Sequence, residues 1–235
     1  MTTTPPPSAP ASATGAPSAG AVSAGGSSSA ARLPLRERKK LRTRQALIDT
    51  ALELFEERGF DAVTLNELCD AVEVSKRTFF RTFESKEDVA LAPTQDLWAA
   101  FLDVLTECPA DGRTLIALFE DALVAAIDRM DADGWAERTL ASRRVAARTP
   151  SMDAHDLAFC QRTSRAALTV VEQRFGVPGT GDVRAHLALD MLIAAFHRAL
   201  DDWMADPAGP TREDLARQLR ATCAELPGAL TVKAG

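Results

Sequence analysis

The sequence of 235 residues has few of the side chains that build metal sites and disulfide frames, with four cysteines and three histidines. The cysteines lie far apart, and no two of them have the CxxC spacing of zinc sites and redox motifs. We therefore expect no metal, no cofactor and no disulfide. Thiols scattered in this way suit a reducing cytoplasm. The four are Cys69, Cys108, Cys160 and Cys223.

Long apolar runs are also missing. No stretch approaches the roughly 18 apolar residues that a membrane-spanning helix needs, so we expect no membrane contact. Windows in which β-branched residues alternate with polar ones, as in half-buried strands, do not stand out. Apolar residues recur instead at helical spacing over nearly the whole chain beyond residue 32. The sequence therefore predicts an all-α protein of about nine helices.

The first 31 residues have no charge, and 29 of them are Ala, Ser, Thr, Pro or Gly. They lack the basic start and continuous apolar stretch of a signal peptide, and they are too rich in proline and glycine to pack. We expect this tail to be disordered. The remaining residues are enough for one mid-sized domain or two small ones.

Charge is distributed unevenly over the rest. The chain has 27 Lys and Arg residues against 33 Asp and Glu residues, a formal net charge of −6, which by itself argues against a nucleic-acid partner. Residues 32–44, however, contain seven basic residues and one acidic residue, while the acidic excess lies beyond residue 92. Because the distribution matters more than the sum, the basic segment keeps DNA open as a partner.

Capping residues predict a first helix over 36–58 and a short second helix over 65–72. Gly59 stops the first helix. Thr64 opens the second, because Glu67, three residues later, completes a capping box.

A third helix, over 75–83, is capped by Ser75 and follows the second after a link of Glu73 and Val74. Two short helices joined by so tight a link have the proportions of a helix-turn-helix. Longer helices separated by proline, glycine and aspartate complete the pattern, over 86–108, 114–130, 135–148, 152–175, 182–205 and 211–226.

The third helix has an apolar and a basic side. Phe79 and Phe83, four residues apart, share the face that would pack on the second helix, and Arg77 and Arg81 fall near the opposite pole. Outward guanidinium groups can bind guanine O6 and N7 in the major groove. Two outward arginines also occur on ordinary solvated helices. The flanks carry Thr78 and Phe80.

Residues 47–91, LIDTALELFEERGFDAVTLNELCDAVEVSKRTFFRTFESKEDVAL, resemble the DNA-binding domain of the TetR family of bacterial regulators. The matching features are the Ala-Leu-x-Leu-Phe-x-x-x-Gly-Phe end of the first helix, then Val63-Thr64-Leu65, Val74-Ser75, Thr78-Phe79-Phe80, Phe83 and Ser85-Lys86-Glu87. The resemblance implies a homodimeric, ligand-responsive regulator, most simply a repressor. It also implies a DNA-binding domain at 32–90, an effector-binding and dimerisation domain at 91–228, and a flexible C-terminus at 229–235.

The resemblance also suggests which residues contact DNA. Thr64 and the amides that follow it would hold one phosphate, Lys86 would hold another, and the basic arm would contact the backbone without reading sequence. The structural alternatives are a simple cap, a solvated lysine and an ordinary charged helix start. The predicted DNA-contacting residues are Arg36, Lys39, Lys40, Arg42, Arg44, Thr64, Ser75, Lys76, Arg77, Thr78, Phe80, Arg81, Thr82 and Lys86.

Three positions depart from the family pattern. The link usually reads Ala-Gly-Val-Ser, so Glu73 must occupy a backbone position that glycine takes with less strain, close to phosphate. Thr82 replaces a Tyr or His and can donate one hydroxyl to a phosphate. Phe80 replaces a frequent Tyr and offers a surface for a thymine methyl. An alternative is a helix-turn-helix protein that has lost DNA binding through Glu73 and acts by protein contacts.

The helix over 182–205 is apolar on two sides, so one side can pack on its own protomer and the other on a partner. Such a dimer would place two recognition helices one or more DNA turns apart, which predicts an inverted-repeat operator. Polar residues along its edge favour interface hydrogen bonds over a metal site, because His186 and His197 are about 16 Å apart along a helix. The polar residues are His186, Asp190, His197 and Asp201. The predicted interface is Leu189, Leu192, Ile193, Phe196, Leu200, Trp203, Leu215 and Leu219.

The predicted effector is an unidentified small molecule, apolar or acyl-like, bound among the central helices. Each predicted lining residue has a simple core role as its alternative, and the basic run near Pro150 can either attract an anion or form a solvated face. The lining set is Trp98, Phe101, Leu105, Phe119, Leu123, Trp135, Met152 and Phe159. The basic run is Arg138, Arg143, Arg144 and Arg148.

A helical hydrolase using Cys160 and His155 is the competing class of function. Five residues apart on a helix, the two side chains point about 140° away from each other, which places the dyad poorly. No serine elbow, phosphate loop or metal motif supports an enzyme. We therefore expect a regulator and not an enzyme.

Overall fold

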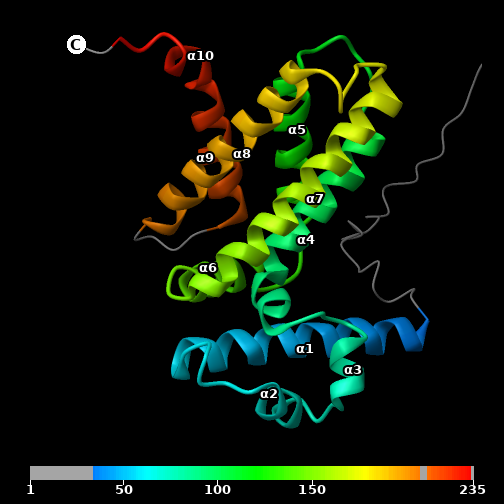
Figure 1. Ribbon diagram of the computed structural model, residues 1–235, viewed down its shortest axis with the longest axis vertical. Coiled ribbons are helices and arrows are strands. Elements are labelled where there is room, and N and C mark those ends of the chain that lie inside the picture. The colour runs from blue at the N-terminus through cyan, green and yellow to red at the C-terminus, as the bar shows by residue number, and fades with distance from the viewer. Residues whose placement is uncertain (1–33, 207–210, 234–235) are drawn as a thin grey trace, which may run out of the picture. The chain divides into compact units, whose positions relative to one another are not determined.

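In the computed structural model, residues 34–206 and 211–233 are described, so the tail predicted at 1–31 and the last two residues lie outside them. Two compact units divide the chain, Met1–Arg38 and Lys39–Gly235. Among the described residues every regular element is a helix, which confirms the all-α prediction (Figure 1). The helices are α1 (Leu35–Arg58), α2 (Leu65–Ala71), α3 (Lys76–Phe80), α4 (Lys86–Glu107), α5 (Leu115–Asp128), α6 (Trp135–Ala146), α7 (Pro150–Phe175), α8 (Val183–Met204), α9 (Arg212–Ala224) and α10 (Leu226–Ala229).

The expected helices are present, with three corrections. Helix α3 ends at Phe80, and residues 81–82 continue it only as a turn. Pro150 was expected to separate two helices but opens α7, where a missing amide hydrogen costs nothing because the first helical amides have no intrahelical acceptor. The four-residue α10, which begins with a Leu-Pro pair, was not expected.

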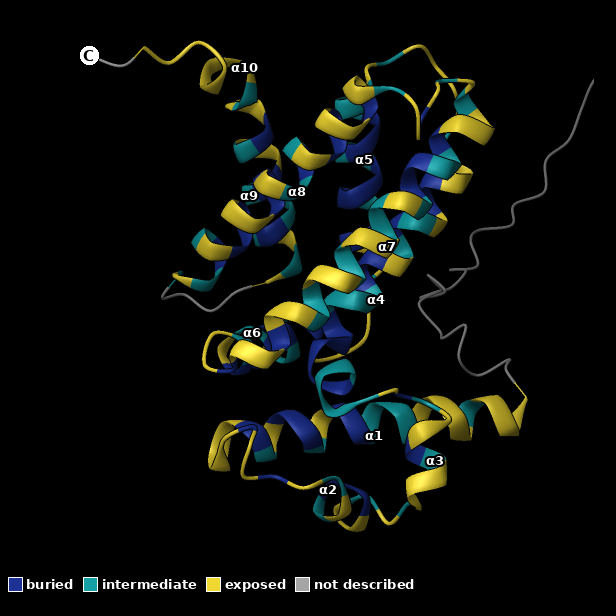
Figure 2. Ribbon diagram, in the orientation of Figure 1, coloured by how far each residue is buried: buried dark blue, intermediate teal, exposed yellow. Residues whose placement is uncertain are grey.

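Two hydrophobic clusters organise the unit Lys39–Gly235. One joins α1, α2, α3 and the start of α4 with Ala141, Val145 and Met152 from α6 and α7. The other joins the rest of α4 with α5, α7, α8, α9 and two residues of α6, Trp135 and Leu140. Figure 2 shows buried residues along α5 and exposed residues on the outer sides of α7 and α8. Helix α4 contributes to both clusters, and Pro93 lies between its two contributions.

Two contacts to α4 position the segments around this point. The Trp135 indole Nε1 donates to the carbonyl of Pro93 at 3.0 Å and ties the start of α6 to α4. The Arg44 guanidinium binds both carboxylate oxygens of Asp96 at 2.8 Å and ties α1 to α4. The predicted domain boundary between residues 90 and 91 thus falls inside a helix that both clusters share. In the described ranges, no helix is long and apolar enough to cross a membrane.

Candidate nucleic-acid interface

The link between α2 and α3 has the backbone of a Schellman motif. The Val74 amide donates to the carbonyl of Cys69 at 2.9 Å, and the Glu73 amide donates to the carbonyl of Asp70 at 3.1 Å. This motif needs a left-handed residue just after the helix, usually glycine. Glu73 takes that place with φ +54°, and it is the one non-glycine residue with positive φ among those described. The expected strain at Glu73 is confirmed.

Helix α3 is mounted on the core by its aromatic residues. Ser75 caps it by accepting the Thr78 amide hydrogen at 3.2 Å. Phe79 is fully buried and its ring lies 5.8 Å from that of Phe83, which is also buried. The Phe80 ring meets Phe79 edge-on at 5.5 Å but is 55% exposed.

The outward face of α3 matches the expected orientation. Lys76 and Arg77 are exposed on the helix, and Arg81 is exposed at its C-cap. None of the three makes an ion pair with another described residue. The face therefore presents three unneutralised cations beside the exposed ring of Phe80. Contact of these residues with DNA stays a prediction.

Thr64 is engaged inside the protein. Its amide and hydroxyl both donate to Glu67 Oε2, at 2.8 and 2.7 Å, and its hydroxyl oxygen accepts from the Glu67 amide, so the predicted capping box is confirmed. Arg58 also donates to Glu67 at 2.6 Å. This bond, followed by those from Thr64, lowers the pKa of Glu67 to about 2. The hydroxyl hydrogen of Thr64 is therefore not free for a phosphate.

Lys86 and Arg44 both contact other parts of the fold, and their predicted binding of phosphate stays a prediction. Lys86 Nζ donates to the carbonyls of Phe60 and Val63 at 2.9 and 2.7 Å and lies 4.4 Å from the centre of the Phe60 ring. Two of its three hydrogens are thus used. Arg44 is held by Asp96 and lies 5.3 Å from the centre of the Phe83 ring.

The hydroxyl of Thr82 also has a partner within the chain. Its hydroxyl donates to the carbonyl of Thr78 at 3.1 Å, one turn back along the chain. A threonine hydroxyl has a single hydrogen, so it has none left to offer a phosphate in this conformation.

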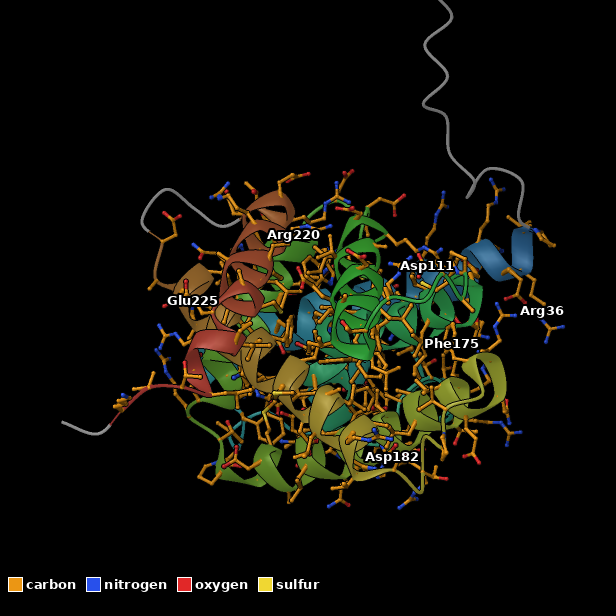
Figure 3. All side chains as sticks on the ribbon, turned by 90° about the horizontal axis from the view of Figure 1, so that it is seen from above. Arg36, Asp111, Phe175, Asp182, Arg220 and Glu225 are labelled. Carbon is orange, nitrogen blue, oxygen red and sulfur yellow. The ribbon has the colours of Figure 1, made fainter. Side chains whose placement is uncertain are left out.

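The remaining residues of the basic arm keep their charges exposed. Arg36 projects from the start of α1 in Figure 3. It lies in the unit Met1–Arg38, whereas Lys39, Lys40 and Arg42 begin the second unit. All four side chains are exposed and form no ion pair within the described ranges. The arm can therefore meet a polyanion without first breaking an internal contact.

A small hollow with a cavity volume of about 10 Å³ lies between α4, α7 and α8. Three of the eight predicted lining residues, Trp98, Phe101 and Phe159, line it. Sequence analysis missed six lining residues, four on α7 and two on α8. The four on α7 have helical spacing that could have revealed a common stripe with Phe159 once α4 was known to face it. The whole lining is Trp98, Phe101, Phe159, Cys160, Thr163, Ser164, Ala167, Leu189 and Ile193.

The other five predicted lining residues do not border this hollow. Leu105, Phe119 and Leu123 are fully buried in the cluster of α4, α5, α7, α8 and α9. Trp135 borders a different cleft, with Gln45 and Pro93. Met152 packs in the cluster formed by α1, α2, α3 and the start of α4. These five residues therefore do not line the hollow, and the core role given above as their alternative fits them better.

The thiol in the hollow is not activated. Burial, and then the nearby Asp156 carboxylate, raise the pKa of Cys160, which disfavours the thiolate that a nucleophile needs. His155 Nε2 lies 3.8 Å from Asp88 on α4. In the described chain no cluster of His, Cys, Asp and Glu side chains could hold a metal ion. The geometry therefore offers the hydrolase alternative no support.

The predicted dimer interface is corrected, because its apolar stripe is already covered. Seven of its eight residues are at most 2% exposed in a single protomer and form the core that α8 and α9 share with α4 and α5, while Ile193 is half-buried and lines the hollow. Side chains with so little exposed surface can bury almost none against a partner. The seven are Leu189, Leu192, Phe196, Leu200, Trp203, Leu215 and Leu219. The large apolar side chains that α8 exposes are Val183, at 67%, and Leu187, at 53%.

The two histidines on the polar edge of α8 have neighbours within the chain. His186 Nδ1 lies 3.2 Å from the carbonyl oxygen of Asp182, one turn back. Desolvation, and then the Arg143 guanidinium, lower the pKa of His197, so its ring lies near α6 of the same protomer although part of it is exposed.

Two arginines of the basic run on α6 reach α1. Arg138 lies 3.5 Å from the carboxylate of Asp49, and Arg144 donates to Glu56 at 3.0 Å. Half of the run thus holds two helices together and is neither a solvated face nor a site for an anion.

Comparison with known proteins places these features in context. The sequence model described as "Bacterial regulatory proteins, tetR family" matches residues 47–92. The HTH-type transcriptional regulator TcmR of Streptomyces glaucescens is 35% identical over 174 residues, 72% of this chain and 76% of that protein. The HTH-type transcriptional repressor NemR of Escherichia coli is 37% identical over 70 residues, 30% of this chain and 35% of that protein. A crystal structure of a putative TetR-family regulator from Mesorhizobium loti is 20% identical with a TM-score of 0.47, covering 81% of this chain and 98% of that one.

Proposed function

The chain belongs to the TetR family of bacterial regulatory proteins, and from that premise we propose that it is a dimeric, ligand-responsive repressor that binds DNA through α3. The observation that carries the proposal is the exposed face of α3. Its three unpaired cations and one exposed ring stand on a helix that Phe79 and Phe83 fix to the core. A rigidly held helix of this kind suits the major groove, where position decides which base edges are reached.

The proposal divides the interface into reading and positioning contacts. Arg77 and Arg81 bind guanine O6 and N7, each with about 1–3 kcal/mol of discrimination. Phe80 packs on a thymine methyl group, which an exposed ring can do without a hydrogen-bond partner. The exposed cations of the arm bind phosphates and supply affinity without sequence preference.

Dimerisation is proposed through the outward face of α8 around Val183 and Leu187. These exposed apolar side chains lie on the side of the helix opposite its core stripe. A two-fold dimer presents two copies of α3 to one side of DNA, so the operator is an inverted repeat.

The effector is proposed to bind at the hollow between α4, α7 and α8, whose volume of about 10 Å³ means that these helices must move apart to admit it. Its walls are three aromatic rings, aliphatic side chains, two hydroxyls and one thiol, with no charged residue. Such a lining favours an apolar, aromatic molecule with one hydrogen-bonding group for Thr163 or Ser164. A binding-induced shift of α4 or of α6 would reach the DNA-binding helices through Arg44–Asp96, Arg138–Asp49 and Arg144–Glu56.

Selection from sheared genomic DNA tests the proposal. The full chain is immobilised, DNA is captured at moderate salt, and the bound fragments are sequenced. Enrichment of an inverted repeat supports a dimeric, sequence-specific regulator. If no palindromic sequence is enriched, the proposal fails. The result would then favour the alternative in which the protein has lost DNA binding and acts by protein contacts.

A further inference from the structure

The acid in the helix-turn-helix link lies beside the DNA backbone in the proposed complex. In this motif the second helix sets its N-terminal residues against base edges while the first crosses the backbone, so the link lies beside phosphates. Glu73 is exposed in that link, two residues before the cap of α3. Its backbone is fixed by two hydrogen bonds and held at φ +54°. The carboxylate therefore cannot leave the interface by a small backbone adjustment.

The charge of Glu73 is not neutralised by its neighbours. Lys76 and Arg77 follow it by three and four residues, yet neither forms an ion pair with it. No other cation among the described residues pairs with it either. A lone carboxylate beside a polyanion repels it, and water and salt weaken the repulsion without removing it.

We propose that Glu73 is an affinity-limiting residue of the DNA interface, an inference that rests on the function proposed above. Its charge weakens the binding of operator and of unrelated DNA by the same factor, because phosphates are present in both. At roughly 6 Å in water the repulsion by one phosphate corresponds to about a threefold loss of affinity. The residue thereby keeps the complex weak enough for release, without taking part in reading the sequence.

Two substitutions separate the charge of Glu73 from its backbone conformation. Glu73→Gln removes the charge and leaves a side chain with the same left-handed strain. Glu73→Gly removes the charge and the strain together. Asp128→Asn is the matched control, because Asp128 is exposed on α5, outside the helix-turn-helix, and its carboxylate has no ion pair among the described residues. It changes the net charge by the same amount.

The full-length variants are titrated with an operator duplex and an unrelated duplex at several salt concentrations. Glu73→Gln and Glu73→Gly are expected to bind both duplexes about threefold more tightly, with a logarithmic salt slope steeper by up to about 0.9. Asp128→Asn is expected to bind like the wild type. Only Glu73→Gly should raise the melting temperature, by about 2–4 °C.

Three results overturn the inference. They are unchanged binding by Glu73→Gln, weaker binding by Glu73→Gln, and a gain confined to the operator duplex, which would make Glu73 a reader of bases. If neither the wild type nor any variant binds either duplex, the proposed function fails and this inference falls with it. Wild-type binding that Glu73→Gln leaves unchanged refutes the inference alone.

Discussion

Lys86 donates a hydrogen bond to the backbone carbonyl of Phe60 at 2.9 Å while its ammonium group lies 4.4 Å from the centre of the same residue's ring. A second bond reaches the carbonyl of Val63 at 2.7 Å. One side chain at the start of α4 thus satisfies two carbonyls of the segment that joins α1 to α2. This arrangement fixes α2, and with it α3, relative to α4.

We expect Lys86→Met to destabilise the protein by about 1–3 kcal/mol, because it leaves two buried carbonyls without a donor while keeping the aliphatic stem. Its salt slope for DNA binding should equal that of the wild type. Lys40→Met is the control, since Lys40 is exposed and unpaired within the described chain, and it should flatten the slope by about 0.9 at unchanged stability. Urea unfolding and titrations with DNA measure both. A flattened slope at full stability in Lys86→Met would support the phosphate role instead.

Substituting the two arginines of α3 should change base preference, whereas substituting a cation of the basic arm should change only overall DNA affinity. Arg77→Ala and Arg81→Ala are each expected to relax the preference at one guanine of the operator by about 1–3 kcal/mol. Lys39→Ala, on the arm, should weaken binding to every sequence alike. Binding to a library of operators with single base changes measures this. If the arginine variants and Lys39→Ala give the same uniform loss, then α3 does not read bases through these side chains.

Glu67 should make the free energy of unfolding depend on pH in the acid range. Hydrogen bonds from Arg58 and Thr64 lower its pKa in the folded chain from 4.5 to about 2. A lowered pKa means that the unfolded chain takes up the proton first, so the contribution of Glu67 is complete above about pH 4.5 and is lost as the pH falls toward 2. Glu67→Gln should therefore be less stable than wild type at pH 6, with the gap closing near pH 2. Thermal unfolding across this range tests it, and a gap independent of pH would refute the titration of Glu67 as its cause.

A larger side chain in the hollow should block the binding of small molecules and leave operator binding unchanged. Ser164 lines the hollow and is half-buried, so a larger side chain there can occupy the hollow without overpacking the core. We expect Ser164→Leu to bind the operator normally and to lose at least tenfold in affinity for N-phenyl-1-naphthylamine, a neutral aromatic fluorescent probe. Thr163→Val, which replaces a hydroxyl with a methyl group, should retain most of the probe affinity because the apolar walls remain. Fluorescence titration measures both. Equal probe binding by Ser164→Leu and wild type would place the ligand elsewhere.

The helix-turn-helix could be predicted from sequence because its determinants are local. The capping box of Thr64, the cap at Ser75 and the spacing of Phe79 and Phe83 all act within four residues, and the left-handed position of Glu73 follows from the length of the link. Each of these expectations rested on backbone geometry that neighbouring residues impose.

The internal contacts of Lys86 and Arg44 could not be predicted, because their partners are distant in sequence. The carbonyls that Lys86 binds are 26 and 23 residues away, and Asp96 is 52 residues from Arg44. A charged residue near a predicted DNA surface looks free until the fold brings such partners to it. Only a third of the lining of the hollow was predicted, for a related reason: periodicity identified apolar faces but not which of them leave space between helices.

The dimer surface was also predicted wrongly because the helices that cover the apolar stripe of α8 are distant in sequence. This changes which residues should be substituted to test dimerisation. Leu192→Asp with Phe196→Asp looks like a test of dimerisation, but both side chains are at most 1% exposed in the protomer, so this pair should unfold the protein. Leu187→Asp, at a side chain that is 53% exposed, should instead fold with a wild-type circular dichroism spectrum and sediment as a monomer. It should bind the operator far more weakly, because two half-sites are no longer engaged together. Leu157→Asp, at a side chain 60% exposed on α7, is the control and should remain dimeric. A dimeric Leu187→Asp with full operator affinity would show that the partner docks on another face.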